Sequence, residues 1–374
     1  MPAQKVRVVS HRKTINGWPT NSISIDFYKG GADNIAESSS YKCKPNIILL
    51  FIPGNPGLIE WYTDTLFKIV EQLGVGYALR GISYAGHGAG DDVIGSADEH
   101  KQSFVSVSGH QDAVLSAKMS ISWTMEGQIK HKLTWVDEVI EEWKAEFKSS
   151  SCQSTEELPR LIFISHSFGA YLVQHMLLRR PALLQQTQQI IHLMPFIRFD
   201  PPPLQKRVLS KLAHSYEYTI PLLSNSVWAL SSTVPRKLIN IFLNKVVGLE
   251  CDKGRNITLD VCTHPRMIRN HLHLGFQEIR EVPELPNDVA FRLIGKACPT
   301  SILFCGGPRQ DQWAPFSHMQ KLIELQKKAI IHNIQCVHIE ELTHDFVVHP
   351  KMIDPVVGFC LDQIKHPKLS CSKL

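Results

Sequence analysis

One short segment of the sequence places a serine where it could act as a nucleophile. Residues 161–171 read LIFISHSFGAY, so a run of strand-forming apolar residues ends in Ser165, His166 and Ser167. A strand, a sharp turn and a helix in succession form a nucleophile elbow, in which the serine is lifted clear of the sheet edge. Small residues are needed two positions before and after the serine, and here they are Ser165 and Gly169. The pattern predicts that Ser167 is a nucleophile.

Ser165 departs from the usual form of this pattern. Glycine normally stands at this position, and serine brings a Cβ atom and a hydroxyl into a tight turn. Ser165 could instead be the nucleophile itself, but Phe163 would then occupy a position that needs a small residue. That geometry is much worse, so Ser167 is favoured.

A serine needs partners for this chemistry. Its hydroxyl is a poor nucleophile at neutral pH unless a histidine, oriented by a carboxylate, takes its proton. In sheets with such an elbow, the acid follows a later strand and the histidine follows the last one. Asp311 follows the apolar run SILFCGG, and His344 follows the last such run, in IEELTHDFVVHP. Taken singly, Asp311 could be a helix N-cap and His344 a loop histidine, with His349 as a weaker substitute. Together, order and placement predict a triad of Ser167, His344 and Asp311.

The oxyanion that forms on attack needs two hydrogen-bond donors. One is expected from the amide after the nucleophile, Phe168, and the other from the early loop IPGNPG. Pro56 has no N–H, so Asn55 is the predicted donor, and Gly54 lets the backbone approach the substrate. The alternative is a Gly/Pro turn that binds no ligand.

The elements that must position these residues follow from the hydrophobic pattern. Apolar runs alternate with amphipathic stretches, which predicts an α/β fold with a mostly parallel sheet and helices on both faces. The predicted strands are residues 47–52, 76–83, 161–164, 190–194, 301–304 and 336–340, and the predicted helices are residues 60–73, 129–147 and 169–179. We expect one domain that covers residues 1–374.

Between Pro195 and Lys296 this alternation lapses, and the segment contains FDPPP and two apolar stretches broken by proline. We interpret residues 196–296 as a helical insertion. Open α/β sheets bind ligands at the carboxyl ends of their strands, where such an insertion leaves the sheet. The insertion is therefore predicted to be a lid, or cap, over the site.

Part of this insertion is apolar and uncharged. Residues 218–234 read YTIPLLSNSVWALSSTV, and Arg236, Lys237 and Lys245 follow them. The segment is short and broken by Pro221, which disfavours a membrane-spanning helix. It predicts either an interfacial patch with a basic flank or lid helices that pack over the pocket.

Potential metal ligands also gather in the insertion. Cys262, His264, His271 and His273 lie close to Cys251, but their spacing follows no structural zinc pattern. No glycine-rich phosphate motif is found either. We predict no metal and no cofactor.

Composition and the two ends of the chain bear on location. The excess of 40 Lys and Arg over 35 Asp and Glu is too weak to indicate nucleic-acid binding. Nine cysteines without a CxxC pair favour reduced thiols in an intracellular protein, and the N-terminus has no apolar core typical of a secretory signal. The last residues, Ser372, Lys373 and Leu374, form the tripeptide that peroxisomal import receptors read. Import into peroxisomes through that receptor is expected.

Six segments, in order, resemble a known family. They are IPGNPG with the following Trp61-Tyr62, SYAGHG, GQIKHKL at 127–133, the elbow at 165–169, QDQWAP at 310–315 and THDFVVHP at 343–350. These segments look like the lipid droplet-associated serine hydrolases, an α/β-hydrolase family. IPGNPG and GQIKHKL are fairly specific, whereas the elbow is shared across the whole superfamily.

The resemblance implies an α/β-hydrolase fold and a peripheral ester hydrolase at the surface of lipid droplets, acting on sterol esters or other neutral lipid esters. By matching motifs it points to Ser167, Asp311 and His344 as the triad of a serine esterase that works through an acyl-enzyme. Epoxide and haloalkane chemistry on this fold uses an aspartate nucleophile, which Ser167 argues against. The alternative is a catalytically weak protein of the same fold that binds or tethers lipid surfaces. The Ser-Lys-Leu ending departs from the family pattern, because it points to peroxisomes instead of lipid droplets.

Overall fold

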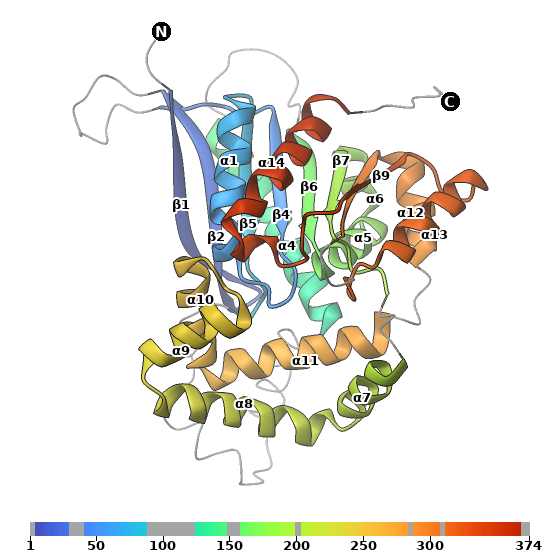
Figure 1. The fold of residues 1–374 in the computed structure, drawn as a ribbon. Helices are drawn as coiled ribbons and strands as arrows, with labels where there is room; N and C mark the ends of the chain where they lie inside the picture. Colours follow the sequence, from blue (N-terminus) through green and yellow to red (C-terminus); the bar gives the residue numbers. More distant parts are fainter. Residues whose placement is uncertain are drawn as a thin grey trace, which may run out of the picture.

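A nine-stranded sheet carries the fold in the computed structural model, which describes residues 4–29, 41–87, 124–147, 158–198, 203–282, 287–306 and 311–367 (Figure 1). The strands are β1 (Gln4–Ile15), β2 (Trp18–Lys29), β3 (Tyr41–Lys42), β4 (Ile47–Ile52), β5 (Tyr77–Ile82), β6 (Arg160–His166), β7 (Thr187–Leu193), β8 (Thr300–Cys305) and β9 (Ile334–Ile339). Their order is β1-β2-β5-β4-β6-β7-β8-β9, and β3 pairs with β2. Strands β4 to β9 are parallel, whereas β2 is antiparallel to both β1 and β5.

The six strands predicted from apolar runs are confirmed as β4 to β9, with shifts of a few residues at their ends. Strands β4 and β6 are neighbours at the centre of the sheet, and Ile52 pairs with Ser165. Because parallel strands end at the same edge, the loop after β4 and the elbow after β6 emerge side by side. This pairing places the IPGNPG loop next to Ser167.

The N-terminal hairpin of β1 and β2 lies outside that prediction. Polar and apolar residues alternate over residues 22–27 of β2, and β1 is mostly polar, so no continuous apolar run marks either strand. Ile23 and Ile25 are buried, but so are the neighbouring Ser22 and Asp26. Asn16 and Gly17 form its two-residue turn with φ values of 52° and 80°. Both residue types accept positive φ, which this tight connection requires.

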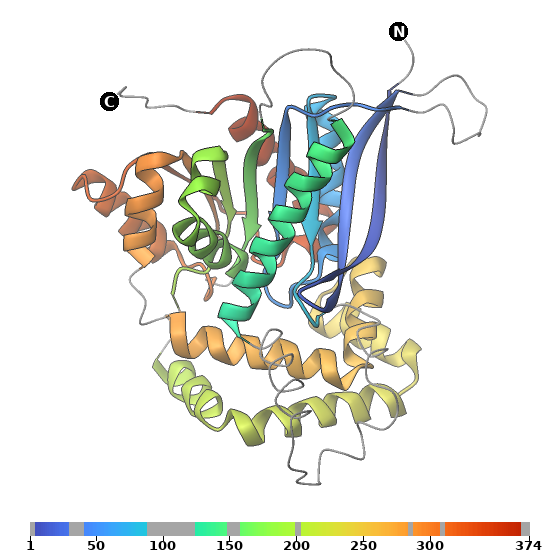
Figure 2. The ribbon, with the colours of Figure 1, turned by 180° about the vertical axis from the view of Figure 1, so that it is seen from behind.

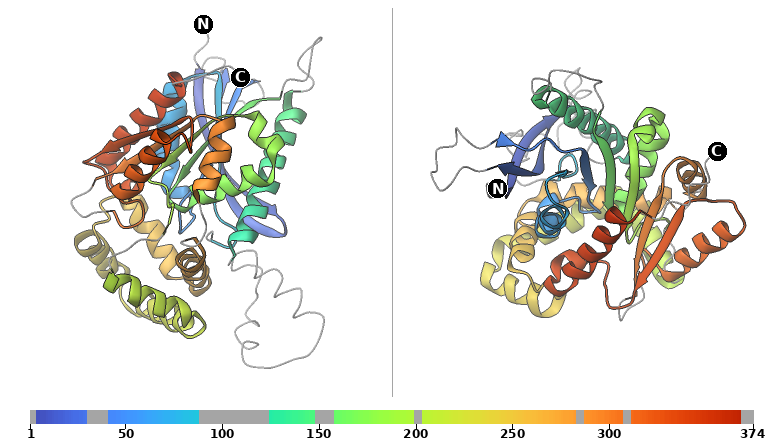
Figure 3. Two further views of the ribbon diagram at one scale, coloured as in Figure 1. Left: turned by 90° about the vertical axis from the view of Figure 1, so that its right-hand side faces the viewer. Right: turned by 90° about the horizontal axis from the view of Figure 1, so that it is seen from above.

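Helices cover both faces of the parallel sheet (Figures 1 and 2). One face carries α1 (Thr63–Leu73), preceded by the 3₁₀ turn η2 (Ile59–Tyr62), and α14 (Pro350–Lys365), preceded by η6 (Phe346–Val348). The other face carries α4 (Met125–Phe147), α5 (Phe168–Arg179) and α6 (Pro181–Gln186). The view from above shows the sheet between α4 and α14 (Figure 3). Alternate residues of β4 serve the two cores, with Leu49 and Phe51 in one and Ile48 and Leu50 in the other.

Helices fill the segment between β7 and β8. They are α7 (Pro203–His214), α8 (Tyr216–Thr233), α9 (Arg236–Phe242), the π-helical turn η4 (Leu243–Val247), α10 (Asp252–Cys262), α11 (Pro265–Glu281) and α12 (Asn287–Ala297). Helices α7 to α11, which we call the cap, lie together below one end of the sheet in Figure 1. Helix α12 instead packs on α5 and α6, and α13 (Phe316–Lys327) follows β8.

The cap meets the carboxyl ends of β4 and β5 through α11. Asn55, three residues after β4, donates its Nδ2–H to the main-chain oxygen of His271 over 3.4 Å. Asn270 donates to the main-chain oxygen of Gly86 in the loop after β5. The helices therefore lie over the edge of the sheet where the IPGNPG loop emerges, while a lid role for residues 196–296 stays a prediction.

Within the described ranges, no helix has both the length and the apolar character that crossing a membrane requires. The seven cysteines in these ranges are all free thiols. Cys152, Cys371 and the tripeptide Ser372, Lys373 and Leu374 lie outside the described residues.

Candidate active site

Ser167 stands at the turn between β6 and α5. Its φ of 50° and ψ of −123° lie in a region that residues other than glycine rarely adopt. The end of β7 and the residues after it hold this conformation, because the Ser167 N–H donates to the oxygen of Leu193 and the Ser167 oxygen accepts from the N–H of Phe196, each over 3.0 Å. The strand, turn and helix expected around Ser167 are all present.

Two glycines allow the close approach of chains around Ser167. A Cβ atom on Gly169 would lie 2.4 Å from the oxygen of Ile52 and 2.5 Å from that of Pro53. A Cβ atom on Gly54 would lie 2.7 Å from the Cβ of Ser167. All three distances are too short for a real Cβ, so the elbow and the loop after β4 are in contact only because these residues are glycine.

Ser165 finds a partner for the hydroxyl that departs from the usual pattern. The side chain is fully buried, and its Oγ lies 2.7 Å from Nδ1 of His192 on β7. Burial lowers the pKa of His192 to about 3, so this ring is neutral. The extra hydroxyl is therefore satisfied between neighbouring strands, and it is not a rival to Ser167.

His344 joins Ser167 to Asp311. The imidazole lies in the loop between β9 and η6, with Nε2 at 2.9 Å from Ser167 Oγ and Nδ1 at 2.7 Å from Asp311 Oδ2. The serine hydroxyl donates to Nε2, and Nδ1–H donates to the carboxylate. The structure thus brings the three predicted residues together from loops that follow β6, β8 and β9. The substitute His349 is bonded elsewhere, to Asp345 at 3.2 Å.

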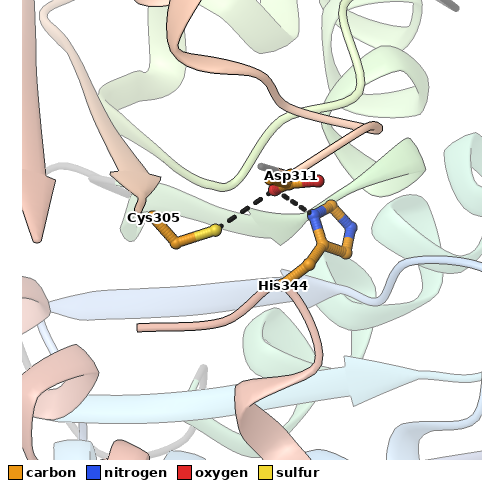
Figure 4. A group of neighbouring side chains, drawn as sticks. All are labelled: Cys305, Asp311 and His344. Carbon is orange, nitrogen blue, oxygen red and sulfur yellow. Dashed lines mark hydrogen bonds and ion pairs between the residues drawn. The ribbon is translucent and has the colours of Figure 1, made fainter. Parts of the chain in front are cut away.

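Both carboxylate oxygens of Asp311 accept hydrogen bonds. Figure 4 shows the contacts of Asp311 with Cys305 and His344. Oδ2 accepts from His344 and from the Cys305 thiol, whose Sγ is 3.1 Å away. Oδ1 accepts from the main-chain N–H groups of Trp313 and Ala314 at 2.8 and 3.1 Å. Asp311 is not the N-cap of α13, where Pro315 stands, although it satisfies the turn that leads into that helix.

The charge of Asp311 follows from these contacts. Burial alone would raise the pKa of this carboxyl, but the His344 imidazole and the hydrogen bonds from His344, Cys305 and Ala314 hold the pKa below its ordinary value. Asp311 is therefore a carboxylate at neutral pH, able to stabilise a positive charge on His344. Cys305 was not a candidate from sequence, because nothing in the run SILFC marks its last residue as a hydrogen-bond donor to the acid.

The two predicted oxyanion donors lie next to the elbow. Phe168 is the first residue of α5, so its N–H has no partner within the helix and lies at the positive end of the helix dipole. The loop that contains Asn55 is fixed by two tyrosines. The Tyr84 hydroxyl donates to the oxygen of Pro53 over 2.6 Å, and Tyr62 accepts from the N–H of Gly54 over 3.3 Å. The donor roles of Phe168 and Asn55 remain predictions.

A buried acid of the cap, absent from the sequence predictions, stands beside this loop. Glu278 of α11 is 5% exposed, and its Oε1 has no hydrogen-bond partner in the described residues. Burial raises the pKa of this carboxyl well above its ordinary value, and a hydrogen bond with Asn55 opposes the shift. Burial of Glu278 therefore favours its protonated form over the carboxylate.

Two histidines of the insertion that are potential metal ligands, His271 and His273, pack against other rings. The His271 ring packs on His87 with 4.5 Å between centroids, and the His273 ring packs on Tyr216 with 5.9 Å. In the described part of the chain, one group of potential metal ligands has its atoms within 4.8 Å of one another, namely Cys305, Asp311 and His344. Asp311 accepts hydrogen bonds from the other two.

Comparison with known proteins agrees with the fold. Residues 45–347 match the family described as lipid-droplet associated hydrolase. The lipid droplet-associated hydrolase of Gallus gallus is 22% identical over 285 residues, which cover 74% of each protein. An epoxide hydrolase from Vigna radiata has a TM-score of 0.53 at 11% identity, over 96% of this chain and 98% of that one. A thermophilic esterase from Thermogutta terrifontis has a TM-score of 0.50 at 13% identity, over 96% and 98%. These two likenesses show the α/β-hydrolase fold.

Proposed function

The chain belongs to the lipid-droplet associated hydrolase family, and we propose that within this hydrolase family it is a serine esterase that acts on lipid esters. The observation that carries the proposal is the unbroken hydrogen-bond chain from Ser167 Oγ to His344 and on to the Asp311 carboxylate, with distances of 2.9 and 2.7 Å. That geometry is what activation of a serine hydroxyl requires.

In the proposed mechanism, Ser167 Oγ forms a bond to the ester carbonyl carbon as its proton passes to His344 Nε2. The carbonyl oxygen becomes an oxyanion, for which the amides of Phe168 and Asn55 are the proposed donors. Each donor would contribute about 3 kcal/mol, or roughly a hundredfold in rate. The bond to the alcohol then breaks, and the alcohol takes the proton from Nε2. Water, deprotonated by His344, releases the acid from Ser167 by the same steps.

The exposed side chains of the cap support the proposal that the protein acts at a lipid surface. Helix α8 is the part of the cap furthest from the sheet in Figures 1 and 2. Its Ile220 is buried, whereas Tyr218 is 81%, Leu222 69% and Leu230 63% exposed. One face of α8 thus packs within the protein, and the other presents apolar side chains outward. The packed face fits the interpretation as a lid helix, and contact of the exposed face with lipid is a proposal.

Exposed apolar side chains continue along the chain beyond α8. Further exposed apolar residues on α9 and η4 are Leu238, Ile241, Phe242, Val246 and Val247. Arg236, Lys237 and Lys245 are exposed within the same segment. Apolar side chains with neighbouring basic ones favour peripheral contact with a lipid surface that carries anionic groups. We propose that this face contacts the lipid surface from which a sterol ester or other neutral lipid ester would enter.

Labelling with a fluorophosphonate probe tests the serine esterase. The full-length protein is expected to become covalently labelled, and Ser167→Ala is expected to lose the label while it keeps the wild-type melting temperature. A native protein that the probe leaves unlabelled would contradict the esterase and favour a non-catalytic lipid-tethering protein. Hydrolysis of cholesteryl oleate and triolein emulsions by the labelled protein then separates sterol esters from glycerides.

Flotation with triolein droplets coated by phosphatidylcholine and phosphatidylserine tests the surface. A variant with aspartate at Leu222, Leu223 and Trp228 is expected to stay in the aqueous fraction. Leu293→Asp is the control, because Leu293 is 47% exposed on α12, away from the cap. Equal flotation of the triple variant and the wild type would contradict a lipid-binding role for this face.

Residence at lipid droplets and import into peroxisomes are separate proposals. Imaging of the protein with an untagged C-terminus, against one with a tag fused after Leu374, distinguishes them. If Ser372, Lys373 and Leu374 bind the import receptor, the tag removes the protein from peroxisomes. No difference between the two forms would contradict receptor binding.

A further inference from the structure

A second histidine, which the proposed mechanism does not use, lies beside Ser167 and His344. His166 is the residue before the nucleophile, at the end of β6, and is 5% exposed. Its Nδ1 lies 2.7 Å from the Tyr62 hydroxyl, and its Nε2 lies 2.9 Å from the main-chain oxygen of His344. The ring therefore bridges the elbow, the η2 turn and the loop that carries the catalytic imidazole.

The partners determine where each proton lies. A carbonyl oxygen only accepts, so Nε2 of His166 must carry the proton that is donated to His344. In the neutral ring Nδ1 then accepts, and the Tyr62 hydroxyl donates to it. The Tyr62 oxygen in turn accepts from the N–H of Gly54. The result is one directed chain from Gly54 through Tyr62 and His166 to the main chain of His344.

The surroundings keep His166 neutral. Burial, together with the neighbouring His344, lowers the pKa of His166 to about 3. The ring centroids of His166 and His344 are 5.0 Å apart. Phe346 packs edge-on against His166, with 5.4 Å between the ring centroids. A positive charge on His166 would oppose the imidazolium that forms on His344 during attack. It would also turn Nδ1 into a donor, so the Tyr62 hydroxyl could no longer donate to it.

We infer that His166 and Tyr62 are positioning residues, which hold the main chain of His344 in register with Ser167 and with the Gly54 loop. This inference rests on the proposed esterase. Three groups must be aligned at the moment of attack: the hydroxyl, the imidazole and the oxyanion donors. They come from loops far apart in sequence, and the Gly54–Tyr62–His166–His344 chain connects all three. Displacement of such groups by about 1 Å costs roughly a hundredfold in rate.

Three substitutions in the full-length protein test the inference, with fluorophosphonate labelling and p-nitrophenyl ester hydrolysis as assays. His166→Phe keeps a buried ring but removes both hydrogen bonds, and it is expected to slow labelling about a hundredfold and to lower kcat with KM unchanged. Tyr62→Phe removes only the hydroxyl and is expected to cost about tenfold. His166→Gln keeps a donor and an acceptor and is expected to recover most of the rate.

His131→Phe is the matched control for the loss of a buried histidine. His131 is fully buried, and its ring nitrogens lie 3.0 Å from Thr20 Oγ1 and 3.1 Å from Lys132 Nζ, in β2 and α4. This variant is expected to lose stability but to keep the labelling rate of its folded fraction. If His166→Phe does the same, His166 is merely structural and the inference is wrong.

A readout independent of turnover separates this inference from the esterase proposal. The low-field proton resonance of His344 Nδ1–H, hydrogen-bonded to Asp311, reports the orientation of the imidazole. We expect it to shift or vanish in His166→Phe and to persist in His131→Phe. An unchanged resonance in His166→Phe contradicts the inference, whereas an unlabelled wild type with the expected shifts contradicts the esterase alone.

Discussion

Gly169→Ala is the smallest change that should separate the elbow from its neighbour β4. The added methyl would lie 2.4 Å from the oxygen of Ile52 and 2.5 Å from that of Pro53, whereas ordinary contact begins near 3.4 Å. Both obstacles are main-chain atoms, which cannot rotate away as a side chain could. Helix α5 must therefore move from β4 by about 1 Å, and Ser167 moves with it.

Two magnitudes follow from this displacement. Forcing a methyl into a packed interior costs about 1–3 kcal/mol of unfolding free energy. Shifting Ser167 by about 1 Å relative to His344 should slow covalent labelling roughly a hundredfold. Urea unfolding measures the first effect, and the rate of fluorophosphonate labelling, corrected for the folded fraction, measures the second.

Gly358→Ala is the control for the same chemical change. Gly358 is exposed in α14, and a Cβ atom there would meet no atom within 4 Å. Alanine is expected to stabilise that helix by up to about 1 kcal/mol and to leave labelling unchanged. If Gly169→Ala behaves like Gly358→Ala in both assays, then the close contact between α5 and β4 does not position Ser167, and the reasoning is refuted.

Three further predictions concern single side chains. Asp311→Asn should lower kcat for ester hydrolysis by about 10⁴, because the amide would present an N–H group to His344 in place of a carboxylate oxygen. The melting temperature should change little, because the amide oxygen still accepts from the N–H groups of Trp313 and Ala314. A loss of kcat below tenfold would contradict the triad. Glu278→Gln should stabilise the protein at pH 7 and above but not at pH 4.5. Folding raises the pKa of Glu278, so the wild type is destabilised as the pH rises from about 4.5 to the folded-state pKa. The loss is about 1.4 kcal/mol of unfolding free energy per pH unit, which the glutamine variant avoids. Urea unfolding across this pH range measures the difference, and parallel curves for both proteins would mean that Glu278 ionises normally. Ser165→Gly should cost about 1–3 kcal/mol in urea unfolding, because His192 loses its partner, while the labelling rate stays within about threefold; a large loss of labelling would give Ser165 a role in the elbow.

The parts of the fold that sequence predicted best are those with an unambiguous pattern. Strands β4, β6 and β8 are buried on both faces, and each contains a continuous apolar run, whereas β9 is mostly only partly buried. The strands of the N-terminal hairpin are interspersed with polar residues and contain no such run. The Asn16-Gly17 pair was its available signal, since this dipeptide favours a two-residue hairpin turn.

The candidate site shows a similar division. Ser167, Asp311 and His344 could be chosen because each follows a predicted strand in a fixed order. Cys305, Tyr62 and His166 could not, because their importance lies in contacts between loops, such as that between His166 and an oxygen 178 residues further along. Asp311 shows why two sequence interpretations can both be partly right: one oxygen satisfies a local turn and the other binds His344.

The path of the chain around the cap has a consequence for how this protein could diversify. Strands β7 and β8 pair directly, with Leu193 beside Leu303, and α12 returns the chain along the sheet to the start of β8. Helices α7 to α11 thus form a cassette inserted into an otherwise complete crossover. Recombination could replace this cassette without altering strand order or the alignment of Ser167, Asp311 and His344. Under the proposed function, such an exchange would direct the molecule to another surface or ester and leave the catalytic residues in place.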